Sequence, residues 1–337
     1  GVHWNRLRLL WSVLHRVQGR RASAARHAGR VLRLADPVEL PGVRGQAYKE
    51  LSHSASDERG VLDLLQSAVD EVSKGAPGNH QVNVYLEYAN QLTHLNRLEE
   101  AREVLARADD ILANEPDPVD TFDAVHRGRL QAQLSLRMGL VYHLGQRYPE
   151  AREHYERGYA RARAMGARFT IGYASDMLGK LAHLTEDWAR SEQHFLEASE
   201  VWTEIGNFIA PAATLNRALM EADRGSGPVA CLIADAAVAS FRESGSEEMA
   251  TLCMLQSAYC YARHGDWVGM DARLAPASTP FGYALIDRET LQLFRKMVRL
   301  ALSAGERRRA DDLCTLLLQR AEELEQEDLV TWARHIA

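Results

Sequence analysis

Five pairs of small or apolar residues, the two members of each pair twelve positions apart, recur along the 337-residue chain. Similar units follow one another at intervals of about 40 residues, the spacing typical of proteins built from stacked helix pairs. A unit of this size is too thin to bury its apolar face alone, so its stability depends on its neighbours. The pattern favours an extended binding surface over a catalytic pocket. The pairs are Ala89 and Ala101, Gly139 and Ala151, Gly179 and Ser191, Ala258 and Met270, and Val298 and Ala310.

The rest of the chain also has a helical pattern. Apolar residues follow the 3.6-residue period, no segment alternates like a strand, and clusters of Gly, Pro and Asp separate the helical segments. Two helix pairs are expected first, at about residues 2–17 with 20–35 and 43–53 with 57–74, before a more regular repeat begins. The sequence therefore predicts an all-α protein, with basic helical pairs over residues 1–78 and a solenoid over residues 79–337.

Two consecutive units share one order of small and large residues. This order resembles the tetratricopeptide repeat (TPR), and the resemblance covers roughly residues 80–337. It implies an α-α superhelix of about seven to eight antiparallel helix pairs, in which the first helix of each pair lines the concave surface. The matching residues are Gly139, Tyr148, Ala151 and Tyr155 in one unit, and Gly179, Trp188, Ser191 and Phe195 in the next.

The units are longer than usual for this family. The steps from residue 89 to 139, 179, 216, 258 and 298 all exceed the typical length of about 34 residues. Long units resemble those in the sensor and scaffold arms of bacterial STAND regulators and TPR-bearing Ser/Thr kinases. The resemblance implies a non-catalytic, protein- or peptide-binding sensor or scaffold within a larger bacterial signalling protein. The alternative is a receptor for a small molecule or signal peptide that controls a transcription factor or effector enzyme, with a pocket lined by His183, Met220 and Tyr259.

In the first helix of each pair, residues that do not pack in the core are expected to face the ligand. Cations outnumber acids at these positions, and arginine binds carboxylates in bidentate geometry. This excess predicts a protein or peptide partner with an acidic segment, whereas the competing interpretation is a solvated face whose arginines pair with neighbouring glutamates. The predicted binding residues are Asn90, His94, His143, Lys180, His183, Arg217, Tyr259, Arg263, Arg295 and Arg299.

The amino-terminal segment is strongly basic. Residues 1–35 contain eight arginines and no acid, so that the remainder carries −6 − 8 = −14 of the net charge of −6. The segment is interpreted as a capping pair, as a surface docked on an upstream effector domain (ATPase, kinase or DNA-binding), or as a phosphate-binding surface. Trp4 and Trp11 have helical spacing with Leu7 and Leu14 and are expected in the core, which disfavours direct nucleic-acid binding.

No catalytic signature is present. The candidate ligands for a metal-dependent hydrolase are Cys253, Cys260 and His264. A structural zinc site needs four ligands, however, and a buried cysteine acts as a small hydrophobic residue. We therefore expect no enzymatic activity, no metal and no cofactor. Cysteines without CxxC spacing, no secretion signal and no long apolar run predict a cytoplasmic protein that does not bind membranes.

Overall fold

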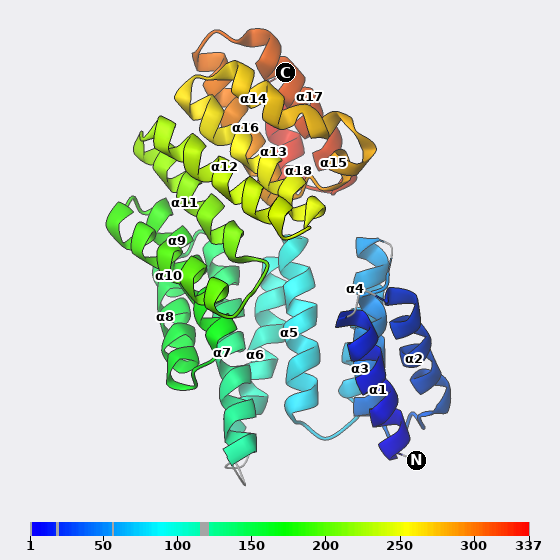
Figure 1. Ribbon diagram of the computed structural model, residues 1–337. Coiled ribbons are helices and arrows are strands. Elements are labelled where there is room, and N and C mark those ends of the chain that lie inside the picture. Colours follow the sequence, from blue (N-terminus) through cyan, green and yellow to red (C-terminus); the bar gives the residue numbers. More distant parts are fainter. Residues whose placement is uncertain (1, 18–19, 56, 115–120, 337) are drawn as a thin grey trace. The chain divides into compact units, whose positions relative to one another are not determined.

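The computed structural model describes residues 2–17, 20–55, 57–114 and 121–336, and over these residues the chain is built from helices without strands (Figure 1). It divides into two units, residues 1–167 and residues 168–337. The boundary predicted between residues 78 and 79 lies inside the first unit and stays a prediction. The predicted all-α solenoid of antiparallel helix pairs is confirmed.

The described part of the first unit contains four helix pairs, and each pair also contacts the next. Its helices are α1 (Val2–Val17), α2 (Arg21–Leu34), α3 (Pro41–Ser52), α4 (Glu58–Val72), α5 (Asn79–His94), α6 (Leu98–Asn114), α7 (Thr121–Leu144) and α8 (Tyr148–Ala164).

The second unit is also built from paired helices, and it contains one short 3₁₀ segment. These elements are α9 (Arg168–Leu184), α10 (Trp188–Glu204), α11 (Ala210–Arg224), α12 (Gly227–Glu243), α13 (Glu247–His264), α14 (Trp267–Leu274), η1 (Ala275–Ser278), α15 (Pro280–Ala284), α16 (Arg288–Ser303), α17 (Arg307–Glu323) and α18 (Glu327–Ile336). The helices α14, α15 and α18 are shorter than the others.

Left-handed backbone conformations set the length of the repeat. Gly206, Gly225, Gly245 and Gly265 have φ values of 63°, 100°, 73° and 81°, and they follow one another at steps of 19 or 20 residues. Glycine adopts this conformation without the steric cost of a Cβ atom, which makes it the usual residue just beyond a helix end. One helix with its turn thus occupies about half of the 40-residue unit seen in the sequence.

The repeated small residues lie where the two helices of a pair cross. Ser191 Oγ donates a hydrogen bond to the carbonyl oxygen of Gly179 at 3.0 Å, which requires close approach of α9 and α10. A Cβ atom on Gly179 would lie 2.7 Å from two ring carbons of Phe195, and one on Gly139 would collide with the ring of Tyr155. The small residue therefore makes room for the aromatic ring of the second helix.

The substitution Gly179→Ala tests this explanation. Alanine is the better helix former by about 1 kcal/mol, but the added methyl overlaps the Phe195 ring, and overpacking costs about 1–3 kcal/mol. We expect a net loss in the free energy of unfolding measured with urea. Gly29→Ala in α2 is the control, because the nearest atom to its new methyl is 3.8 Å away, and it should gain about 0.5–1 kcal/mol. A gain from both substitutions would contradict the crossing geometry.

The prediction that Trp4 and Trp11 lie in the core is wrong. Trp4 and Trp11 are exposed rather than buried in the core, because α1 turns Asn5 and Ser12 inward instead. Trp188 is only half-buried, whereas Trp202 on the same helix is enclosed by the core. Over the described residues, no helix combines the length and apolarity needed to cross a bilayer.

Candidate ligand-binding surface

Four first helices of the second unit, α9, α11, α13 and α16, form a continuous series in which each contacts the next. Side chains from the two ends of this series meet: Lys180 Nζ of α9 lies 3.1 Å from Glu289 Oε1 of α16. Side chains separated by two intervening helices meet only on the inside of a curved stack. The surface on the inside of this stack, where side chains of the four helices meet, is called the inner face.

A single carboxylate joins all four helices of the inner face. Asp223 Oδ2, near the end of α11, accepts a hydrogen bond from His183 Nε2 at 2.9 Å and lies 3.3 Å from Lys296 Nζ. Its Oδ1 accepts a hydrogen bond from the Tyr259 hydroxyl and lies 3.7 Å from Arg263 Nε. These five residues are the Asp223 cluster, and they come from α9, α11, α13 and α16.

The environment of the Asp223 cluster fixes its protonation states. Burial opposes charge on Asp223, but the hydrogen bond from His183 and the charge of Lys296 outweigh it and hold the pKa of this carboxyl well below its usual range. Burial raises the pKa of the Tyr259 hydroxyl, and the nearby Asp223 charge raises it further. At neutral pH, Asp223 is therefore an ionised acceptor and Tyr259 a neutral donor.

A second polar group lies on the same helices. Asp176 Oδ1 accepts a hydrogen bond from Asn216 Nδ2 at 2.7 Å, and Lys180 Nζ lies 3.7 Å from Asp176 Oδ2. Burial raises the pKa of Asp176, although Lys180 and Asn216 act in the opposite direction. Burial also opposes the charge on Lys180, but Glu289 and Asp176 outweigh it, and the pKa of the amine is raised. Lys180 is thus a fixed cation between two acids.

The structure brings together part of the predicted binding set. Lys180, His183, Tyr259 and Arg263 lie in the two groups just described. Arg299 instead places its guanidinium over the ring of Trp332, 5.6 Å from the ring centroid.

Arg217 and Arg295 lie on the same helices, α11 and α16, but are differently placed. The Nε atom of each is buried and has no hydrogen-bond partner among the described residues. Burial lowers the pKa of Arg295, and the neighbouring charge of Arg299 lowers it further. These two guanidinium groups therefore retain donor capacity that the folded chain does not use.

The other three predicted residues lie in the first unit. Asn90 of α5 accepts a hydrogen bond from Arg137 of α7. The His143 ring lies 6.1 Å, between centroids, from the ring of Tyr155 within its own helix pair, and His94 is exposed. Ligand contact by Asn90, His94 and His143 stays a prediction.

The binding-site prediction missed Asp223, Lys296 and Glu289. One signal pointed to Asp223: it lies 40 positions after His183 and 40 positions before Arg263, and its contacts with both show that these positions face one another. Asp176 and Asn216 are also 40 positions apart and hydrogen-bonded. Equivalent positions in successive units therefore contact one another, so an acid at such a position indicates the surface as well as a cation does.

The cysteines offer poor metal ligands. Burial raises the pKa of the Cys253 thiol to about 12, and Cys260 is also buried, so both thiols are protonated near neutral pH. In the part of the chain that the structure describes, no three His, Cys, Asp or Glu side chains are arranged to hold a metal ion.

Neither a family model nor a curated protein sequence matches this chain. Among solved structures, a Rap protein complexed with Competence and Sporulation Factor is 13% identical, with a TM-score of 0.72 over 94% of this chain and 84% of that one. Aspartyl phosphate phosphatase F from Bacillus subtilis is 10% identical, with a TM-score of 0.63 over 87% of this chain and 75% of the other.

A STAND protein with a TPR sensor, from Pyrococcus horikoshii, is also similar in structure. It is 13% identical, with a TM-score of 0.60 over 99% of this chain and 50% of that one. At these identities the likeness concerns the fold alone, and it agrees with the helix pairs described above. The chain therefore has the fold of the tetratricopeptide-repeat proteins.

Proposed function

We propose that this protein is a non-catalytic regulatory domain whose inner face binds a protein or peptide segment bearing acidic side chains. The observation that carries this proposal is the excess of cationic donors over internal acids on one continuous surface. The residues named above on α9, α11, α13 and α16 include the cations Lys180, Arg217, Arg263, Arg295, Lys296 and Arg299, and the acids Asp176, Asp223 and Glu289.

The unsatisfied donors specify the chemistry of the ligand. Arg217 Nε and Arg295 Nε are buried without partners among the described residues, and an unpaired buried donor costs about 1–3 kcal/mol. A carboxylate is the group that satisfies a guanidinium in bidentate geometry. Ligand binding at these positions therefore removes a cost already present in the free protein.

The internal ion pairs define how a ligand enters. Asp223 and Glu289 form ion pairs with cations on separate helices. A ligand carboxylate would interact with the same cations, Lys180, Lys296 and Arg263. The ligand carboxylate shares these three cations with the two acids, because displacing Asp223 completely would leave a partly buried charge without a partner at a large cost. A ligand that bridges several helices stabilises their shared interfaces together, and this provides the regulatory signal.

The comparisons support a regulatory peptide-binding role. One similar structure is a Rap protein complexed with Competence and Sporulation Factor, and another carries its TPR repeats as the sensor of a STAND protein. In this chain Met220 and Tyr259 are buried, and Tyr259 and His183 are bonded to Asp223. These three side chains thus do not line an open small-molecule pocket, and a peptide is the favoured ligand. The signal would pass to an ATPase, kinase or DNA-binding effector domain.

Fluorescence anisotropy with labelled peptides tests the proposal. The probe is an Asp/Glu-rich peptide, compared with its Asn/Gln analogue, and we expect only the acidic peptide to bind, more weakly as salt is raised. Arg217→Glu combined with Arg295→Glu should weaken binding at least about tenfold, because two partly buried charges are reversed.

The matched control reverses two arginines on second helices. Arg190→Glu with Arg308→Glu makes the same change in net charge on α10 and α17, at side chains that are 64% and 93% exposed. This variant should bind nearly as well as the unmodified protein. Equal loss of binding in both double variants would show that net charge alone acts, and would refute the inner face as the binding surface.

A further inference from the structure

Helix α1 has the reverse of the usual orientation for a surface helix. An amphipathic helix normally packs its apolar face on the core. Here Asn5 and Ser12 are the buried residues, at 4% and 0% exposure, and Ser12 Oγ donates to the carbonyl oxygen of Ala24 at 2.9 Å. Five large apolar residues remain exposed, each by 41–66%: Trp4, Leu7, Leu10, Trp11 and Leu14.

These five residues, which we call the α1 stripe, occupy one side of the helix. Their spacing of three and four positions places them within three successive turns, along roughly 15 Å of helix. Single exposed hydrophobic residues are ordinary, but a continuous exposed strip with two tryptophans marks an interaction surface. The inward face of α1 is already occupied by α2 and α3, so no rotation of α1 would hide the stripe without exposing that face.

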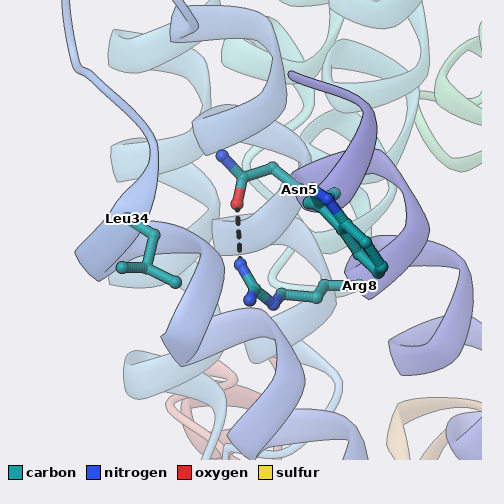
Figure 2. Close-up of a pocket in the computed structure, with 4 residues that line it drawn as sticks. Asn5, Arg8 and Leu34 are labelled. Carbon is teal, nitrogen blue, oxygen red and sulfur yellow. Dashed lines mark hydrogen bonds between the residues drawn. The ribbon is translucent and has the colours of Figure 1, made fainter. Parts of the chain in front are cut away.

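A pocket lies at the amino-terminal end of the α1 stripe. It has a volume of about 400 Å³ and is lined by Trp4, Asn5, Arg8 and Leu34 (Figure 2). Leu34 comes from α2 and is itself exposed, while Arg8 donates a hydrogen bond to Asn5 Oδ1 at 3.3 Å. The pocket thus offers apolar walls for one inserted side chain and a guanidinium beside it.

The charge around the α1 stripe selects the partner. Residues 1–35 contain eight arginines and no acid, and Arg6, Arg26, Arg30 and Arg33 are exposed. Burial lowers the pKa of His27, and the charges of His15, Arg26, Arg30 and Arg8 lower it further, which agrees with a positive potential at this surface. A second copy docked stripe to stripe would bring arginines against arginines, so the complementary surface is acidic.

We propose that the α1 stripe and its pocket form a docking site for an acidic amphipathic helix of a partner protein. The apolar residues of that helix lie along Trp4, Leu7 and Trp11, one of them entering the pocket, and its carboxylates pair with the surrounding arginines. This is the helix-in-groove mode of recognition. A lipid surface fits less well, because a bilayer does not insert a single side chain into a recessed pocket. The site is independent of the inner face.

Binding of a designed helical peptide to the full chain tests the proposal. The probe is a labelled amphipathic peptide of about 18 residues, long enough to form a helix, with Leu and Trp on one face and Glu on the other. We expect anisotropy to rise and peptide helicity to increase on binding. A peptide with Lys in place of Glu, and one with Ala in place of Leu and Trp, should each bind at least about tenfold more weakly.

Variants locate the site on the chain. Trp4→Ala combined with Trp11→Ala should weaken binding of the acidic helix at least about tenfold while leaving the melting temperature nearly unchanged, because both rings are exposed. Phe208→Ala with Leu232→Ala removes two other exposed apolar side chains, which are 60% and 72% exposed, and should have no effect.

Other results would overturn the proposal. Unchanged peptide affinity in the tryptophan variant would place the site elsewhere. Sedimentation with phosphatidylserine vesicles, but no binding of the acidic helix, would assign the α1 stripe to a membrane. Concentration-dependent dimerisation abolished by the same two substitutions would assign it to a second copy. Loss of the acidic-helix interaction alone would leave the inner-face proposal untouched, because the two sites are tested with different peptides and variants.

Discussion

Trp202→Ala is expected to lower the free energy of unfolding of the second unit by about 3–5 kcal/mol. The Trp202 side chain is 2% exposed, and its Nε1 donates a hydrogen bond to the carbonyl oxygen of Phe169 at 3.2 Å. The indole lies so close to Gly172 of α9 that a Cβ atom there would collide with it. Truncation leaves a cavity between α9, α10 and α11 and removes the hydrogen bond to the Phe169 carbonyl.

Urea denaturation followed by circular dichroism measures this loss, since tryptophan fluorescence changes with the substitution itself. The melting temperature should fall by on the order of 10 °C. Trp188→Ala on the same helix is the matched control: its ring is half-buried, so it should cost clearly less. Equal losses from the two substitutions would mean that Trp202 is not the residue that holds α10 between its neighbours.

Asp223→Asn is expected to destabilise the second unit by about 2–3 kcal/mol, because it removes a partly buried negative charge without changing the size of the side chain. Lys296 and Arg263 then lose their counter-charge, and the hydrogen bonds from His183 and Tyr259 weaken. Asp271→Asn is the isosteric control, because Asp271 pairs with Arg309 at a side chain that is 49% exposed, and it should cost under about 1 kcal/mol.

The pH dependence of this difference follows from the pKa of Asp223. The folded-state pKa lies below the unfolded value of about 3.9, so the carboxylate stabilises the fold fully above that value. The contribution is lost as the pH falls below about 4 through the folded-state pKa. Urea titrations should therefore show the stability difference between the two proteins shrinking as the pH falls below about 4. A difference that grows with acidification would contradict the assigned hydrogen bonds.

The helical part of this structure is readable from the sequence because its causes are local. Small residues twelve positions apart mark the helix crossings, and Ala89, Ala101, Ala151 and Ser191 are all fully buried. Gly225 and Gly265 mark helix ends through their left-handed backbone. The period of the apolar residues and the conformational freedom of glycine are enough to define the helix pairs.

The inner face was predicted less completely because its contacts depend on curvature. Lys180 and Glu289 are 109 positions apart, and only the bending of four stacked helices brings them together. Asp223 was missed because a search for cations ignores the acid that binds them. Trp4 and Trp11 show a second limit of sequence-based prediction. Their spacing identifies an apolar face of the helix, but it does not say whether this chain or a partner covers that face.

The hydrogen bonds between positions 40 residues apart restrict how the length of this protein can change. His183 with Asp223 and Asp176 with Asn216 both depend on the angular position of each residue around its helix. Inserting one residue inside α11 would rotate everything beyond it by about 100° and swing Asp223 out of reach of all its partners. Natural length variation in this region should therefore occur in the turns or by gain and loss of whole units, and hardly ever inside the helices.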